Sequence, residues 1–120
     1  MAGRYDITIE QGATFSLPLV IKNSDGSYFN LTNYTPRGQI RKYIRSTTII
    51  VSFNFTITDA INGAMIVSLT AIQTAAILAG ETSTEAKSKY IYDIEIVHSS
   101  GEPVKRILNG SVYVNPNVTR

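Results

Sequence analysis

Strand-length runs in which apolar and polar residues alternate extend through most of this chain, from residue 5 to residue 114. Successive side chains of a β-strand point to opposite faces, so each run would bury one face and expose the other. Clusters of turn-forming residues separate the runs at 23–26, 59–63 and 99–102. The pattern therefore predicts a small antiparallel β domain.

The alternation also assigns each predicted strand an inward face. The predicted strands cover residues 5–9, 14–22, 39–44, 50–58, 64–69, 90–97 and 104–114, the last being either one strand bent at Gly110 or two short ones. The inward side chains are Phe15, Leu17, Leu19, Ile21, Gly38, Ile40, Ile44, Val51, Phe53, Phe55, Ile57, Tyr90, Tyr92, Ile94 and Ile96. Because Pro18 cannot donate a ladder hydrogen bond, its strand is expected at a sheet edge or at a bulge.

The segments between these strands carry signals of their own. Residues 28–31 form a short stretch, and residues 32–36 are predicted to connect the two sheets. The Asn62-Gly63 pair fits a tight hairpin turn between the strands at 50–58 and 64–69. Residues 70–78 predict one short helix, capped by Thr70 and ended by Gly80, and residues 81–88 predict an exposed loop.

These elements define the fold class. The sequence predicts an all-β protein: an immunoglobulin-like antiparallel β-sandwich of seven to eight strands with one short helix at about residues 70–78. A small jelly roll is the alternative, and both fit the strand count better than a closed barrel. With 120 residues, 43% of them hydrophobic, residues 1–120 fit a single domain that can bury a core.

Composition argues against several classes of site. The chain has no cysteine and a single histidine, so neither a thiolate metal site nor a disulfide framework is expected, and no cofactor is predicted. The first twenty residues lack the features of a secretion signal, and no apolar run is long enough for a membrane span. The formal net charge of +2 is small beside that of a dedicated nucleic-acid-binding protein.

One predicted strand has a basic outer face that could bind a partner. Arg37, Arg41 and Arg45 lie on it together with Tyr43, and Lys42 is adjacent. Solvation is the simplest explanation of this face. A charged protein interface comes next, and nucleic-acid binding comes last because only one strand carries the feature.

Aromatic residues outside the predicted core are a second candidate. Tyr28, Phe29 and Tyr34 lie in connecting segments, and Tyr43 lies on an outward face, where such rings can anchor a partner protein or simply pack over an end of the sandwich. Asp93 and Glu95 share an outer strand face, but without a predicted pocket or a further acid they do not indicate catalysis. No enzymatic activity is predicted.

Four segments in order along the chain resemble small virion structural proteins of tailed bacteriophages, including immunoglobulin-like modules of tail and baseplate proteins. The segments are residues 5–15, residues 29–35 with 38–41, residues 69–75, and residues 92–95. In such proteins the short helix runs through a tight turn into the tyrosine-rich strand, whereas here residues 81–89 intervene. This longer loop places any contacts carried over from that region in doubt.

The resemblance implies a structural role without catalytic residues. It implies a rigid β-sandwich adaptor in the tail or baseplate, located in the virion after assembly in the host bacterial cytoplasm. Its partners would be other virion proteins, in a homo-oligomer or another symmetric multi-copy assembly. The alternatives are a head decoration protein that clamps shell subunits, and a carbohydrate-binding or host-adsorption module, which the absence of tryptophan disfavours.

Overall fold

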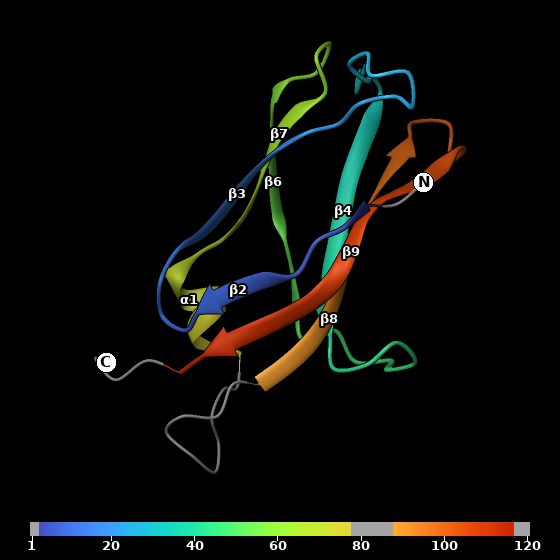
Figure 1. Cartoon of the computed structure of the whole chain (residues 1–120). Helices are drawn as coiled ribbons and strands as arrows, with labels where there is room; N and C mark the ends of the chain where they lie inside the picture. The colour runs from blue at the N-terminus through green and yellow to red at the C-terminus, as the bar shows by residue number, and fades with distance from the viewer. Residues whose placement is uncertain (1–2, 78–87, 117–120) are drawn as a thin grey trace.

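The computed structural model describes residues 3–77 and 88–116 of the chain (Figure 1). Within these ranges it contains nine strands and one short helix, and the predicted all-β sandwich is confirmed. The elements are β1 (Gly3–Arg4), β2 (Ile7–Glu10), β3 (Phe15–Val20), β4 (Tyr34–Arg41), β5 (Val51–Ser52), β6 (Asn54–Asp59), β7 (Ala64–Leu69), α1 (Ala71–Ala75), β8 (Ser88–His98) and β9 (Val104–Asn115).

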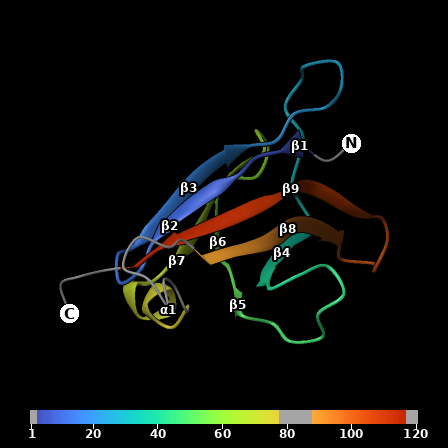
Figure 2. The same ribbon diagram turned by 60° about the horizontal axis from the view of Figure 1, so that its bottom comes forward.

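The strands form two sheets. One has the order β1-β9-β8-β4-β5, with β2 also paired to β9, and the other has the order β3-β7-β6. Figure 2 shows β9, β8 and β4 side by side in the first sheet. The strands β3, β7 and β6 correspond to B, E and D of an immunoglobulin-like sandwich, and β4, β8 and β9 to C, F and G.

The first strand departs from the prediction in two ways. The expected strand at residues 5–9 is two strands, β1 and β2, and both pair with β9 in parallel rather than antiparallel. They are separated at Tyr5 and Asp6, where the chain passes closest to Gly110: a Cβ built on Gly110 would lie 2.2 Å from the Tyr5 carbonyl oxygen. A side chain there would force the two backbones apart, so a glycine is required where the N-terminal segment crosses β9.

The strand predicted at residues 39–44 corresponds to β4, which begins five residues earlier, at Tyr34. It pairs with β8 from Tyr34 to Arg41. The alternation therefore begins at Tyr34, and it was hidden by Pro36 and Gly38, two residue types that are rare in strands. Pro36 is tolerated because β5 pairs only with residues 39 and 40 of β4. Ile44 was expected to face inward, but it lies beyond the strand and its side chain is 83% exposed.

The strand predicted at residues 50–58 is also divided, because β5 belongs to the first sheet and β6 to the second. The chain crosses between the sheets at Phe53, whose backbone N–H donates to the Gly38 carbonyl at 3.0 Å. The Phe53 ring is buried and lies 5.9 Å from the Tyr92 ring. Ile57, expected inside, is 38% exposed. These two divisions account for nine strands where seven to eight were predicted.

The remaining predictions of the core and the turns are largely confirmed. The four inward side chains of β8 are buried, β3 is an edge strand as Pro18 indicated, and β9 is one continuous strand. The predicted hairpin joins β6 to β7, with Gly63 at a φ of 68°. The inward residues of β3 are partly buried and pack against the core cluster. The core proper consists of Ile7, Ile9, Ile40, Phe53, Met65, Val67, Leu69, Ile77, Tyr90, Tyr92, Ile94, Val112 and Val114.

The helix α1 covers one end of the sandwich, as predicted, but is shorter than the expected 70–78 (Figure 1). Thr70 and Gln73 form a capping box, in which each side chain accepts from the other residue's backbone N–H. The buried Thr74 hydroxyl donates to the Ala13 carbonyl at 2.8 Å, which holds the helix against the turn after β2. Gly80 and the predicted loop at 81–88 lie outside the described residues, apart from Ser88, which begins β8.

Candidate protein-binding groove

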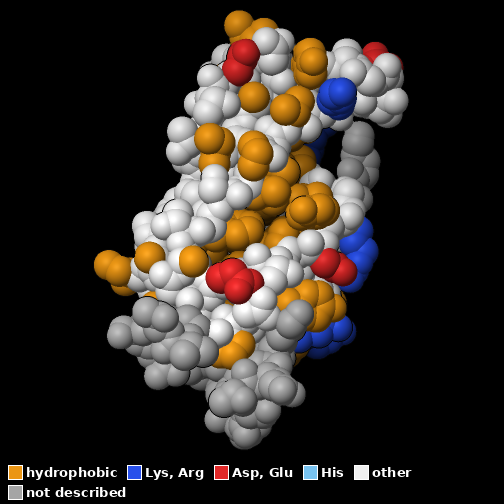
Figure 3. Space-filling model, turned by 60° about the vertical axis from the view of Figure 1, so that its left-hand side comes forward, with side chains coloured by type: hydrophobic (Ala, Val, Ile, Leu, Met, Phe, Trp, Pro, Cys, Tyr) orange, Lys and Arg blue, Asp and Glu red, His pale blue; other side chains and the backbone are white. Residues whose placement is uncertain are grey.

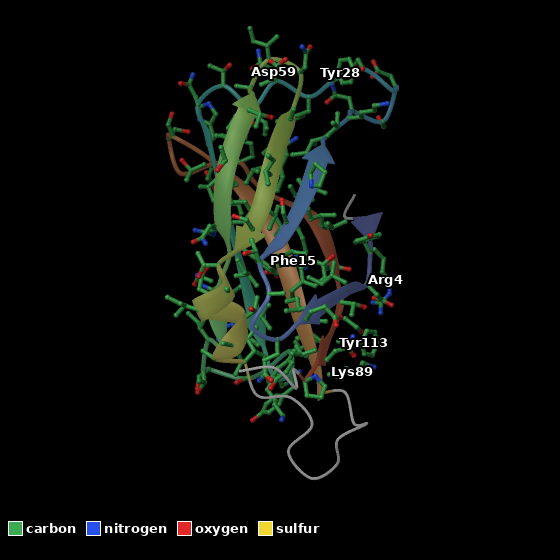
Figure 4. All side chains as sticks on the ribbon, turned by 90° about the vertical axis from the view of Figure 1, so that its left-hand side faces the viewer. Arg4, Phe15, Tyr28, Asp59, Lys89 and Tyr113 are labelled. Carbon is green, nitrogen blue, oxygen red and sulfur yellow. The ribbon has the colours of Figure 1, made fainter. Side chains whose placement is uncertain are left out.

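The seven interface candidates from the sequence do not form one surface. The loop that carries Tyr43 and Arg45 follows β4 at one end of the sandwich, and Tyr28 lies at the other end, as Figures 1 and 4 show. Arg37 lies within β4, and Arg41 is the last residue of that strand. The structure therefore divides the candidates into a strand face, an end loop and an aromatic cluster.

The two arginines of the strand face, Arg37 and Arg41, both have partners within the sheet and the loop after β4. Arg37 Nε donates to a carboxylate oxygen of Glu95, which is directly opposite in the register of β4 and β8. Arg106 of β9 lies 3.3 Å from an Asp93 oxygen. The Arg41 guanidinium donates to the Ser46 carbonyl at 2.7 Å and thereby holds the loop after β4. Asp93 and Glu95 thus serve as ion-pair partners for this face.

The aromatic candidates have different roles. Phe29 and Tyr34 pack edge to face with ring centroids 5.2 Å apart, and the Tyr34 ring packs in the same way on His98 at 5.1 Å. These two rings are partly buried and close one end of the sandwich, so local packing accounts for them. Tyr28 is 55% exposed, with the Lys22 amine 5.5 Å from its ring centroid.

A groove that the sequence analysis did not identify lies beside this aromatic cluster. It has a volume of about 730 Å³ and opens between β3 of one sheet and β9 of the other. Residues 19–23, Phe29, Ile96 and residues 104–108 line it. Figure 3 views this side of the molecule and shows hydrophobic side chains in a hollow that runs between the sheets.

The groove exists because two strand edges are left without a neighbouring strand among the described residues. β1 begins opposite Leu108, so residues 104–107 of β9 extend past it. In the second sheet β3 pairs with β7 on one side only. Since β1 and β2 both pair with β9, neither of these strands covers the outer edge of β3.

The charged side chains that line the groove are all basic and exposed. Its charged residues are Lys22, Lys105 and Arg106, and within the described part of the chain no Asp or Glu lines it. Lys105 is opposite the buried Ile96 in the register of β8 and β9, which places it on the inner face of the sheet. Its amine lies 5.4 Å from the centroid of the Phe29 ring, a cation–π contact.

The sequence held a partial signal of this groove. Val20 lies on the outward face of its strand and is 55% exposed, which is unusual for a strand that needed only one apolar face. The position of Lys105 was not predictable, because a register shift between Ile94 and Glu95 changes which residues of β9 face inward. Finding the groove required the pairing of both sheets.

Other kinds of site find little support in the described ranges. No group of three His, Asp or Glu side chains there is close enough to hold a metal ion. The helix in the described part of the chain is too short to cross a membrane.

Burial raises the pKa of Tyr92 to about 12, with the negative charge of Asp6 adding to the effect, and the Tyr92 hydroxyl donates to the Tyr5 carbonyl. Tyr92 is therefore a neutral structural donor at physiological pH.

Comparisons with known proteins do not assign a family. No protein-family model matches this sequence, and no curated protein matches it significantly.

Proposed function

We propose that this protein is a non-enzymatic structural component of a tailed-phage particle that acts through protein–protein contacts. The groove between the free edges of β3 and β9 carries the binding part of the proposal, because it offers apolar surface and strand edges to another chain. The particle context rests on the resemblance of four sequence segments to phage virion proteins. Within the particle, we propose the role of an adaptor in the tail or baseplate.

The architecture suits a mechanical role. Most core residues come from strands with long registers, such as the eight uninterrupted pairs between β4 and β8, so the two sheets form a stiff body. Such a body transmits force between neighbours without a conformational change of its own. Edge strands, end loops and the groove then supply the contacts, which symmetry would repeat in a multi-copy assembly.

Localisation in purified particles tests this proposal. An epitope-tagged copy would be produced during infection, the particles purified through a density gradient, and the tag located by immunogold electron microscopy. Gold at the tail end is expected. Gold over the head would overturn the adaptor role and support a decoration protein, and absence of the tag from intact particles would refute a structural role altogether. A tagged host protein expressed at the same level is the control for nonspecific trapping of tagged protein in the purified particles.

A carbohydrate-binding role has less geometric support. A glycan site needs exposed rings that converge on one groove. Among the described tyrosines, the most exposed are Tyr43 and Tyr28, at 61% and 55%. The loop after β4 that carries Tyr43 lies at the opposite end of the sandwich from Tyr28. We therefore keep protein–protein contact as the proposed mode of binding.

A further inference from the structure

The backbone of β3 beside the groove is oriented to accept another strand. Ile21 donates its N–H to the Gly63 carbonyl at 2.9 Å and accepts from the Phe29 N–H at 2.9 Å, so both its polar groups point toward β7 and the following loop. Alternation then turns the N–H and C=O groups of Val20 and Lys22 in the opposite direction, over the groove. An incoming strand can therefore form ladder hydrogen bonds there.

Pro18 limits where that strand can pair. It is opposite Ile66 in the register of β3 and β7, and as a proline it has no N–H to offer at the outer edge. Pairing is thus directed to the end of β3 and the residues after it, which line the groove. The five residues 19–23 span about 17 Å at about 3.3 Å per residue, enough for a short strand.

The apolar floor of the groove favours an incoming strand in which apolar and polar side chains alternate. Leu19, Ile21, Ile107 and Leu108 are partly buried and pack against the core, so each keeps some surface that a second apolar side chain would cover. Val104, at the rim, is 46% exposed. A strand that places apolar residues at alternate positions would fill this surface while its other face remained in water.

The positive charge of the groove favours an occupant that carries a carboxylate. Lys105 extends from the inner face of β9, opposite the buried Ile96, and Lys22 adds charge at the other wall. Arg106 is already paired with Asp93, which leaves the two lysines as the cations available to a partner. A carboxylate on the incoming strand would gain a charge-assisted hydrogen bond from one of them.

We propose that the groove binds an extended segment of another protein, added as a strand to the edge of β3, with alternating apolar residues and at least one Asp or Glu directed at Lys105. The inference rests on the proposed protein-binding function and specifies its partner. A second copy of this chain fits less well, because its own free β3 edge also carries Lys22, and its approach would bring like charges together.

A peptide library tests the specificity. A random twelve-residue library, made by messenger RNA display, would be selected against the immobilised full-length protein. The expected result is enrichment of sequences with alternating apolar residues and an acidic residue. Selected peptides that lack acidic residues, or that shift backbone amide resonances away from residues 19–23 and 104–108 in nuclear magnetic resonance spectra, would overturn the proposal.

Charge reversal then tests the role of Lys105. Lys105→Glu should weaken the best selected peptide by about tenfold or more, and a peptide with lysine in place of its acidic residue should recover binding to that variant. Lys89→Glu makes the same charge change at the opposite end of the sandwich, where Figure 4 labels Lys89, and should leave affinity within about twofold. Equal losses for both variants would show a general charge effect and overturn the specific contact.

Backbone pairing is tested independently of any variant. Two peptides would be made, one methylated at the odd-numbered backbone nitrogens and one at the even-numbered nitrogens, because methylation removes the N–H donor. Only the set of N–H groups that faces β3 can form ladder hydrogen bonds, so one peptide should lose binding and the other should keep it. Loss of binding with neither peptide would exclude strand addition.

Sedimentation of the protein without peptide tests whether a second copy is the occupant. A dimer that is abolished by Lys105→Glu would overturn the proposed partner. Peptide binding without incorporation into particles would refute the phage role alone, and incorporation without peptide binding would refute this inference alone.

Discussion

Replacing Gly110 with alanine should strain the crossing of the N-terminal segment over β9. The added Cβ would lie 2.2 Å from the Tyr5 carbonyl oxygen, 2.8 Å from its carbon and 3.0 Å from a carboxylate oxygen of Asp6. Ordinary contacts to a Cβ begin near 3.4 Å, so the Tyr5 backbone has to move by about 1 Å. Two of these three atoms are backbone, which cannot rotate away as a flexible side chain would.

The cost of this change follows from the hydrogen bonds at the crossing. Tyr5 N–H donates to the Asn109 carbonyl at 2.9 Å, Ser111 N–H donates to the Asp6 carboxylate at 2.9 Å, and the Tyr92 hydroxyl donates to the Tyr5 carbonyl. At about 0.5–1.5 kcal/mol each, losing all three would cost about 1.5–4.5 kcal/mol. Retaining them under strain would cost about 1–3 kcal/mol. Because the protein takes the cheaper route, we expect these bonds to be retained under strain, with a loss of about 1–3 kcal/mol.

Urea denaturation followed by circular dichroism measures this loss, and hydrogen exchange at the Tyr5 and Ser111 amides locates it. Gly3→Ala is the matched control. It makes the same chemical change in β1, but its Cβ would meet only ordinary contacts of 3.5 and 3.8 Å, so stability should change by less than about 0.5 kcal/mol. A Gly110→Ala variant as stable as Gly3→Ala, with unchanged amide protection, would refute the close crossing of the N-terminal segment over β9.

Three further changes test other parts of the fold. Because the folded pKa of Tyr92 is about 12 against 10.0 for the free phenol, the neutral form contributes stability that is complete below pH 10 and lost as the pH rises toward 12. The loss should be about 2–3 kcal/mol in alkaline urea titrations and should be absent in Tyr92→Phe, the two proteins being compared at each pH. Thr74→Val removes the hydroxyl that donates to Ala13 and should cost about 1–2 kcal/mol by urea denaturation, whereas a neutral effect would show that water replaces this contact. Arg37→Ala should cost less than about 1 kcal/mol by thermal melting, since the Arg37 side chain in the pair with Glu95 is 59% exposed, and a larger cost would indicate that the pair stabilises the sheet.

The fold could be predicted where a residue's role depends on its immediate neighbours in sequence. Alternation located the buried face of β8, the Asn62-Gly63 pair located a hairpin, and Thr70 located the start of α1. These features are fixed by local backbone geometry and side-chain direction. Their physical causes are therefore contained in windows of a few residues.

The errors arose where distant parts of the chain decide the outcome. The apolar run at 50–58 satisfies one strand pattern, but it serves two sheets because Phe53 fills the space between them. The split between β1 and β2 depends on Gly110, more than a hundred residues away in sequence. The groove likewise depends on which strand the N-terminal segment joins, and no local pattern distinguishes β9 from β3 as its partner.

Three residues in or beside this groove also hinder edge-to-edge pairing of the protein with itself. A free strand edge is a hazard in any β protein, and an inward-pointing charge or a proline is a common safeguard. Here Pro18 removes one outer donor of β3, and Lys22 and Lys105 place positive charge where a second edge would approach. These safeguards disfavour a strand edge that carries positive charge. They still allow a strand that carries a carboxylate to pair beyond Pro18. Protection against edge-to-edge self-pairing and the proposed preference for an acidic partner therefore follow from the same three residues.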